Sequence, residues 1–355
     1  MTNQQQTNST DSDPKPDNVV RRGRVPKPQG LMAQTADLAP NSARFATVLS
    51  KYAVVGVTVI LLIVFGALNS STFLTGDNFE LVLGSNAVAL ILAMAGLLPL
   101  IGGEFDLSIG YTLEVSVVLT AVLSRAGVPL GVTILVVLIA GALIGLINAF
   151  FITVLGVSSF ITTLGVGTVV SAVSLALTQG EILINGLPQQ LESFAQGSIG
   201  PVPLILIPAA VVFVALWVVG EFTTYGRRLL AVGLSSRASL LAGVRVSRMV
   251  GSTFVISGVL ASFAGWLELG RVGSAAAGIG PSFLLPAIAA AFLGATTIKP
   301  GRFNVLGTGV AVLLVAIGVN GLELNGAAYW AQPLFDGAIL LLAVGTAQLL
   351  ARRGR

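Results

Sequence analysis

The chain has 355 residues, of which 54% are hydrophobic and 10% are charged, and its formal net charge is +4. It contains no cysteine and no histidine, which excludes disulfides, thiol catalysis and histidine-ligated metals, and no metal site is expected. We attribute the positive charge to membrane orientation and to attraction by anionic lipid, so no nucleic-acid partner is expected.

Residues 1–45 are rich in Gln, Asn, Asp, Pro and Ser and contain few large apolar groups. Such a segment cannot bury a core, so we expect a disordered cytoplasmic tail. No apolar run follows the start methionine closely, and no cleavable signal peptide is expected. Residues 46–350 should then form the membrane domain, followed by a basic cytoplasmic C-terminus at 351–355.

The rest of the chain consists of long apolar segments. A bilayer core is about 30 Å thick, so a spanning helix needs about 20 mostly apolar residues. We therefore predict an all-α integral membrane protein with about ten transmembrane helices, the eighth of them short and tilted or partly re-entrant. The predicted spans are 50–68, 81–101, 107–124, 129–151, 158–178, 203–220, 250–270, 283–298, 303–322 and 332–350.

The basic residues give this arrangement an orientation. All but two of the 19 Lys and Arg residues lie before the first span, between spans six and seven, between spans eight and nine, or after span ten. The two exceptions are Arg125 and Arg271. With both termini in the cytoplasm, ten spans place the four basic groups inside and both exceptions outside, as the positive-inside rule requires.

Between the second and third spans, residues 102–110 read GGEFDLSIG. Gly102 and Gly103 permit a sharp turn. Asp106 is well placed to cap the third span. Capping explains Asp106 alone and leaves the rest of this motif turn, including Ser108, without a role.

Polar groups within the spans predict a translocation pathway. Glu114 lies near the middle of span three, where a charge costs about 2.5–3.5 kcal/mol on insertion scales. We expect it to be protonated, or to face a wet cavity with Asn, Ser or backbone donors. A pathway or ion-coupling role and a structural role both remain open. The other predicted pathway residues are neutral: Asn86, Asn148, Thr162, Thr163, Asn320 and Gln332. Such a lining suits a neutral polyhydroxylated substrate.

Three charged residues near the outer ends of spans have simpler interpretations. Glu268 and Arg271 are three residues apart on one helix face and should form an ion pair. Asp336 is expected in the first turn of span ten, where a carboxylate interacts favourably with the positive helix end. Capping is therefore expected there in preference to substrate contact.

The long inner loop, residues 221–249, carries a second motif. Gly233 is interpreted as a helix break and Ser235 as a helix cap, so that residues 236–242 form a short amphipathic helix ended by Gly243. This helix is either a docking element for a cytoplasmic partner or a basic interfacial loop. The chain has no phosphate-binding loop of the GxxxxGK[ST] type, so we expect a transport subunit that is not an enzyme and binds no ATP.

The motif turn and the inner loop together resemble the permease family of bacterial ATP-binding-cassette sugar importers, of the ribose/xylose/arabinose/galactose type. The turn is similar to the family's G-G-x-D-L-S-x-G string. Residues 226–244 are similar to its G-R-x-x-x-A-x-G-x-x-x-x-A-A-x-x-x-G-[IV] segment, with Ser239 in place of the second Ala. Residues 159–165, 287–294 and 320–337 also agree with family patterns, and the resemblance covers roughly 50–350.

The resemblance implies a type II importer bundle in the bacterial inner membrane. Its partners would be a cytoplasmic ATPase that holds ATP and Mg, an identical or paralogous second permease, and a periplasmic binding protein. The residues implied to couple to the ATPase are Gly226, Arg227, Gly233, Arg237, Ala238 and Gly243. The family's Gly-rich stretch after residue 294 is replaced here by a segment that contains Lys299 and Pro300.

The sequence thus predicts the permease subunit of an ATP-driven importer for a monosaccharide or small polyol. Two alternatives remain. A proton- or sodium-coupled secondary transporter would account for Glu114 and for the glycine-rich interruptions of the spans. A nucleoside or autoinducer permease is the second alternative, within the importer class itself.

Overall fold

The computed structural model describes residues 41–353, so the predicted tail lies almost wholly outside the described part of the chain. The elements in chain order are α1 (Asn41–Leu68), α2 (Ser70–Phe73), α3 (Gly76–Ile101), α4 (Ile109–Arg125), α5 (Leu130–Thr153), α6 (Ser159–Thr178), α7 (Gln189–Ala195), β1 (Ser198–Ile199), β2 (Val202–Pro203), α8 (Leu206–Phe222), α9 (Thr224–Leu234), α10 (Ser236–Leu241), α11 (Val246–Val272), α12 (Gly280–Gly294), α13 (Val305–Leu324) and α14 (Ala331–Arg353). The two strands form a small antiparallel hairpin with Ser198 opposite Pro203.

A helix lies on each of the ten predicted ranges, which confirms the all-α membrane class. Within the described residues, five helices are long and apolar enough to cross a membrane, or six if the bent pair α8 and α9 counts as one span. The count of ten spans is therefore not confirmed by length and composition. Helix α12 has 15 residues, or roughly 22 Å at about 1.5 Å per residue, so the expectation of a short eighth segment is confirmed.

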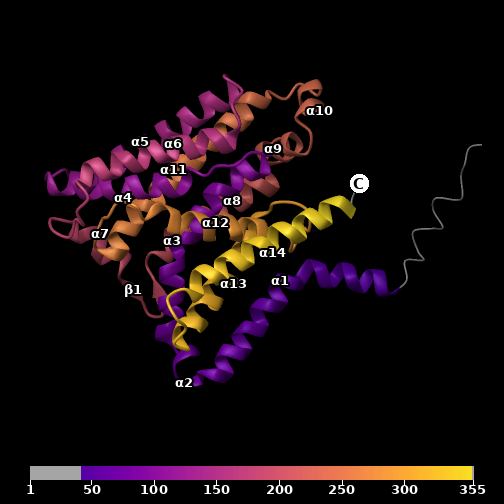
Figure 1. The fold of residues 1–355 in the computed structure, drawn as a ribbon, viewed down its shortest axis with the longest axis horizontal. Coiled ribbons are helices and arrows are strands. Elements are labelled where there is room, and N and C mark those ends of the chain that lie inside the picture. The colour runs from indigo at the N-terminus through magenta and orange to yellow at the C-terminus, as the bar shows by residue number, and fades with distance from the viewer. Residues whose placement is uncertain (1–40, 354–355) are drawn as a thin grey trace, which may run out of the picture. The chain divides into compact units, whose positions relative to one another are not determined.

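Helix α3 is the central element of the bundle. It packs against α4 and α11 on one side and against α12 and α13 on the other (Figure 1). Its side chains Val88, Ile91 and Leu92 are fully buried in the main apolar cluster, together with Leu113 of α4 and Leu267 of α11. Helices α5 and α6 instead expose most of their apolar surface, as expected for a face that meets lipid.

Small residues allow α5 and α11 to pack closely. A Cβ atom on Gly141 or Gly145 would collide with the side chain of Ser262 or with the carbonyl of Phe254, both in α11. Gly258 of α11 meets the carbonyl of Gly141 in the same way. Backbone approach of this kind is typical of membrane helices, so the high glycine content has a packing role here.

Candidate functional sites

The motif turn between α3 and α4 is an irregular segment held by side chains of α6. The Phe105 N–H donates to Ser159 Oγ at 3.2 Å, and the Leu107 N–H donates to Thr163 Oγ1 at 3.0 Å. Backbone donors among apolar helices need such partners, because no lipid group can replace them. The turn and the hydroxyls of α6 therefore form one unit, which capping by Asp106 could not explain.

Asp106 joins this turn to two further helices. One carboxylate oxygen accepts from the Ser108 N–H at 3.0 Å and from Ser108 Oγ at 2.6 Å. The other accepts from Ser257 Oγ of α11 at 2.8 Å. Ser108 Oγ in turn accepts from Asn148 Nδ2 of α5 at 2.8 Å. We call Asp106, Ser108, Asn148 and Ser257 the turn network.

The capping expectation for Asp106 is corrected by this geometry. Ser108 occupies the N-cap position of α4, and Asp106 bonds to Ser108 itself instead of to an N–H of the first helical turn. Ser257 was missed by the sequence analysis. A single serine within a span gives no local signal, because such a side chain commonly bonds to its own helix backbone.

Helix α9 packs directly onto the motif turn. Gly103 has a φ of +88°, which favours glycine. A Cβ atom on Gly233 would collide with the carbonyl oxygen of Ile101, and Leu229 is buried beside Gly102. Gly233 lies inside α9, so its interpretation as a helix break is wrong. Its role is close approach between α9 and the turn.

The short helix predicted after Ser235 is present as α10. The Ser235 side chain accepts from the Ala238 N–H at 3.3 Å, and Gly243 follows the helix with a φ of +81°. Leu240 and Leu241 are 63% and 90% exposed. Arg237 and Ala238 are exposed as well, so α10 presents an uncovered surface of mixed apolar and basic character.

The structure also places the two remaining coupling candidates. Gly226 is buried at the sharp bend of 72° between α8 and α9, where a Cβ atom would collide with the backbone of Gly220. Arg227 is exposed and donates to the Phe222 carbonyl at 3.4 Å. The bend is capped by Thr223, whose hydroxyl accepts from the Gly226 N–H.

Glu114 lies in a helix–helix contact. It is fully buried, and its carboxylate accepts from the Gly280 N–H at the start of α12 at 2.8 Å and from Ser171 Oγ of α6 at 3.1 Å. The expected serine and backbone donors are therefore present. Thr162 is also buried, and its hydroxyl has no hydrogen-bond partner among the described residues.

Three of the predicted pathway residues, Asn86, Asn320 and Gln332, come together at one cavity of about 290 Å³ between α3, α12, α13 and α14. We call it the outer cavity, after the side of the membrane on which the predicted orientation places it. Its other lining residues are Leu81, Val82, Ser85, Ala89, Ser282, Phe283, Pro286, Val315, Ala316, Val319, Glu323 and Asp336.

Asp336 is not at the end of its helix. Helix α14 begins at Ala331 and has no acidic residue in its first turn, so the expected capping role of Asp336 is wrong. Its carboxylate lies at the outer cavity instead. Asp336 lies five residues after Ala331, beyond the first helical turn of about 3.6 residues.

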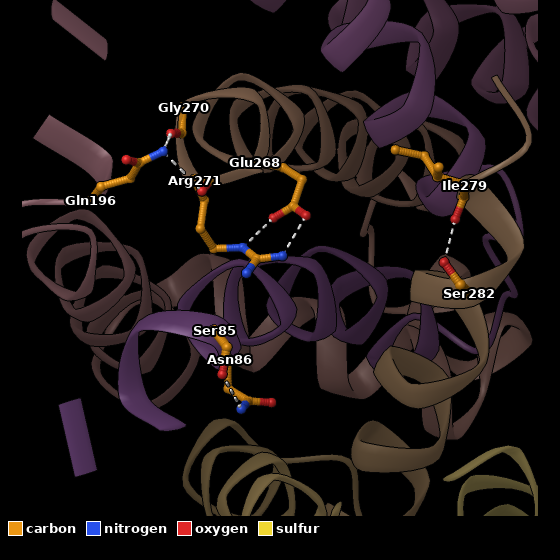
Figure 2. Close-up of polar contacts among 8 residues, drawn as sticks. All are labelled: Ser85, Asn86, Gln196, Glu268, Gly270, Arg271, Ile279 and Ser282. Atoms are coloured by element: carbon orange, nitrogen blue, oxygen red, sulfur yellow. Dashed lines mark hydrogen bonds and ion pairs between the residues drawn. The ribbon is translucent and has the colours of Figure 1, made fainter. Parts of the chain in front are cut away.

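The predicted pair of Glu268 and Arg271 is confirmed as a bidentate ion pair near the end of α11 (Figure 2). Arg271 Nε and Nη2 donate to the two carboxylate oxygens at 2.8 and 2.7 Å. Figure 2 also shows Gln196, the residue that follows α7, whose amide donates to the carbonyls of Gly270 and Arg271. These contacts fix α7 against the end of α11.

The segment that departs from the family pattern, between α12 and α13, bonds to the bend of α8 and α9. Lys299 forms an ion pair with Glu221 near the end of α8. Asn304 caps α13, where its Oδ1 accepts from the Gly307 N–H at 2.7 Å, and its amide donates to the carbonyl of Gly294. Both partners of the ion pair are partly exposed, so its contribution to stability is small.

Comparison with known proteins shows the family to which the chain belongs. A family profile described as the permease component of the branched-chain amino acid transport system matches residues 78–344. The chain is 30% identical over 298 residues to the autoinducer 2 import system permease protein LsrD of Escherichia coli (strain K12), covering 82% of this chain and 90% of the relative. The LsrD protein of Photorhabdus luminescens is 27% identical over 300 residues, covering 83% and 90%. No solved structure matches.

Proposed function

Because the chain belongs to the family described as the permease component of the branched-chain amino acid transport system, we propose that it forms half of the translocation pathway of an ATP-driven importer. The chain is a multi-pass membrane transport subunit of the ATP-binding-cassette permease class, and not an enzyme. We propose that it lies in the bacterial inner membrane with both termini in the cytoplasm. The other half of the pathway would be a second copy or a paralogue.

The observation that carries this proposal is the continuous connection from α10 to the membrane interior. Helix α10 presents the exposed Leu240, Leu241 and Arg237, which suit a cytoplasmic protein partner. It is joined to α9, which packs through Gly233 on the motif turn. The turn network then bonds to α5 and α11, and the hydroxyls of α6 hold the turn itself.

Such a connection suits a subunit that is moved by a separate ATPase. A displacement of α10 would reach the motif turn through rigid helical contacts and buried hydrogen bonds, which resist independent movement. The proposed ATPase would hold ATP and Mg and would contact α10 near Ala238 and Gly243. A periplasmic binding protein would deliver the solute to the opposite side.

We propose a neutral, hydroxyl-rich solute of the size of a monosaccharide or small polyol. The residues that line the outer cavity include no Lys or Arg, so an anionic solute would meet no cationic partner there. The relatives are autoinducer 2 import permeases by name, which makes that signal molecule the second candidate substrate. A branched-chain amino acid fits less well, because its carboxylate would face Glu323 and Asp336.

The ion-coupled alternative depended on Glu114. Its two oxygens are occupied by the Gly280 N–H and the Ser171 hydroxyl, which supports a structural role between α4, α6 and α12. An ion-coupling carboxylate would have to exchange its partners in each transport cycle. Close helix packing accounts for Gly141, Gly145 and Gly258 without any ion coupling.

The proposal is tested by uptake of labelled monosaccharides into cells that carry this chain with its adjacent transporter genes. Deleting the chain, or replacing the phosphate-loop lysine of the partner ATPase, should abolish accumulation to the same extent. Accumulation that survives loss of the ATPase would contradict the proposal. The control is a strain in which both wild-type proteins are restored.

A further inference from the structure

The outer cavity contains one acceptor atom that the protein leaves unsatisfied. Asp336 Oδ1 is buried, yet it has no hydrogen-bond partner among the described residues. It is the one carboxylate oxygen among the buried, unpartnered polar atoms of the described part of the chain. Leaving such an atom unpaired is costly, roughly 1–3 kcal/mol or more for a charged group, so a donor from outside the chain would be favourable there.

The neighbouring amides are held by the protein. Asn320 and Asn78 exchange two hydrogen bonds at 2.9 and 3.0 Å, which uses the amide of Asn320 within the wall. Asn86 Nδ2 donates to the Val82 carbonyl at 2.9 Å and to Ser85 Oγ at 3.2 Å, as the stick view shows for Ser85 (Figure 2). Its Oδ1 has no donor among the described residues and remains an acceptor.

The free hydrogen-bonding groups of the cavity therefore include several acceptors, beside the Gln332 amide, which can both donate and accept. The carboxylate oxygens of Asp336 and Glu323 and the amide oxygen of Asn86 accept hydrogen bonds. A ligand with several hydroxyl donors matches this set, whereas a ligand rich in acceptors does not. The volume of about 290 Å³ is near the lower limit of roughly 300–1,000 Å³ for small-molecule pockets, so it suits a single small molecule.

We propose that the outer cavity is a binding station for a neutral hydroxyl-bearing solute, with Asp336 Oδ1 accepting a hydrogen bond from a solute hydroxyl. The inference rests on the proposed import function and adds the residues that contact the solute. Asp336 and Gln332 come from α14 and Asn86 from α3, so closure or opening of the station would follow movement of α14 relative to α3.

The first test compares two substitutions of Asp336 in the intact transporter. The probe is whichever of D-ribose, D-xylose, L-arabinose, D-galactose or glycerol the wild-type cells accumulate. Asp336→Asn keeps an acceptor oxygen and should change the KM of uptake by less than about threefold. Asp336→Leu has a similar shape without an acceptor and should raise the KM by about tenfold, with a maximal rate per inserted complex that changes little. Glu181→Leu, an exposed acidic position outside the cavity lining, is the matched control.

The second test uses the absence of native cysteine. In the intact complex, Gln332→Cys should react with an aqueous methanethiosulfonate reagent, and a saturating concentration of the transported solute should slow that reaction at least fivefold. Val173→Cys lies on the exposed apolar face of α6 and should show no protection by the solute. This test does not depend on whether Asp336→Leu inserts into the membrane.

The outcomes separate the two proposals. If the wild-type complex accumulates the probe while Asp336→Leu keeps the wild-type KM, the binding station is wrong and the import function stands. An equal rate of Gln332→Cys modification with and without solute would overturn the station in the same way. If none of the hydroxylated probes is accumulated by the wild-type complex, the proposed function itself fails.

Discussion

At the scale of single residues, the buried polar groups divide into two sets. Asp106 and Glu114 each have both carboxylate oxygens occupied by donors from the protein, and both connect helices that are distant in sequence. Asp336 has an oxygen without a donor among the described residues and lies at a cavity. The first set therefore stabilises the bundle, whereas Asp336 is available to a ligand.

Replacing Asp106 by a residue without an acceptor is expected to lower the stability of the bundle. Asp106→Ala would leave the Ser108 N–H and the Ser257 hydroxyl without an acceptor, at about 1–3 kcal/mol for each buried group. The thermal unfolding midpoint of the Asp106→Ala variant in detergent should fall clearly below that of Asp106→Asn, which keeps one acceptor oxygen. Equal midpoints for the two variants would contradict the turn network.

Glu114→Gln tests the structural assignment of Glu114. The amide oxygen can still accept from the Gly280 N–H, while titration is removed. Uptake by the complex should remain within a few-fold of wild type and should keep the wild-type pH profile. A complex that assembles normally but loses all uptake would support the ion-coupled alternative.

Local signals allowed some of these residues to be predicted, and others depended on tertiary contacts. Ser235 and Gly243 were identified correctly because a cap and a left-handed glycine act within a few residues. Gly233 was misinterpreted because a helix partner, the Ile101 carbonyl, demands the glycine. Ser257 could not be found at all, since its partner Asp106 is 151 residues away. The role of Asp336 was missed because the cavity at which it lies is formed with residues of α3, α12 and α13, which are distant in sequence.

At the scale of elements, α9 and α10 are the helices that transmit the movement of the ATPase in the proposed mechanism. Helix α9 is fixed to the motif turn by Gly233 and Leu229, whereas α10 projects with Leu240 and Leu241 exposed. A helix packed against the bundle, followed by a helix with an exposed surface, is the arrangement expected where the ATPase binds α10 and displaces it. Gly243 follows α10, and its positive φ turns the chain towards α11.

Bulky or strained residues in α10 and at Gly243 should interrupt the coupling between the ATPase and transport while leaving the bundle intact. Ala238→Trp adds a large side chain to the exposed face of α10, and Gly243→Val places a β-branched residue at a φ of +81°. Both should abolish transport and weaken co-purification of the ATPase, with normal membrane insertion. Arg237→Gln is the milder comparison. Normal transport by both small-residue variants would make the loop a simple basic tether.

At the scale of the whole molecule, the helices that meet the span criteria are only part of the bundle. Helices α12 and α14 contribute shorter apolar segments, and α8 bends by 72° into α9. Helix α3, with its side chains buried on both sides, holds the two groups of helices together. Among the described residues, length and composition give five or six membrane-spanning helices, whereas the charge pattern of the loops predicts ten.

Reporter fusions decide between these counts. With ten spans and cytoplasmic termini, fusions within 125–128, at 190 and at 275 should report the outer side. Fusions at 30, 237, 300 and 355 should report the cytoplasm, since the loops that carry most Lys and Arg residues remain inside. An outer signal at 237 would overturn both the count and the proposed docking of α10.

The central claim is that this chain moves its solute only when a separate ATPase acts on α10. The most direct measurement is uptake of a labelled monosaccharide into proteoliposomes that contain the purified chain with its ATPase and binding protein. We predict uptake when ATP is supplied on the ATPase side without any ion gradient, and none when a proton or sodium gradient replaces ATP. Gradient-driven accumulation by the chain alone would contradict the account.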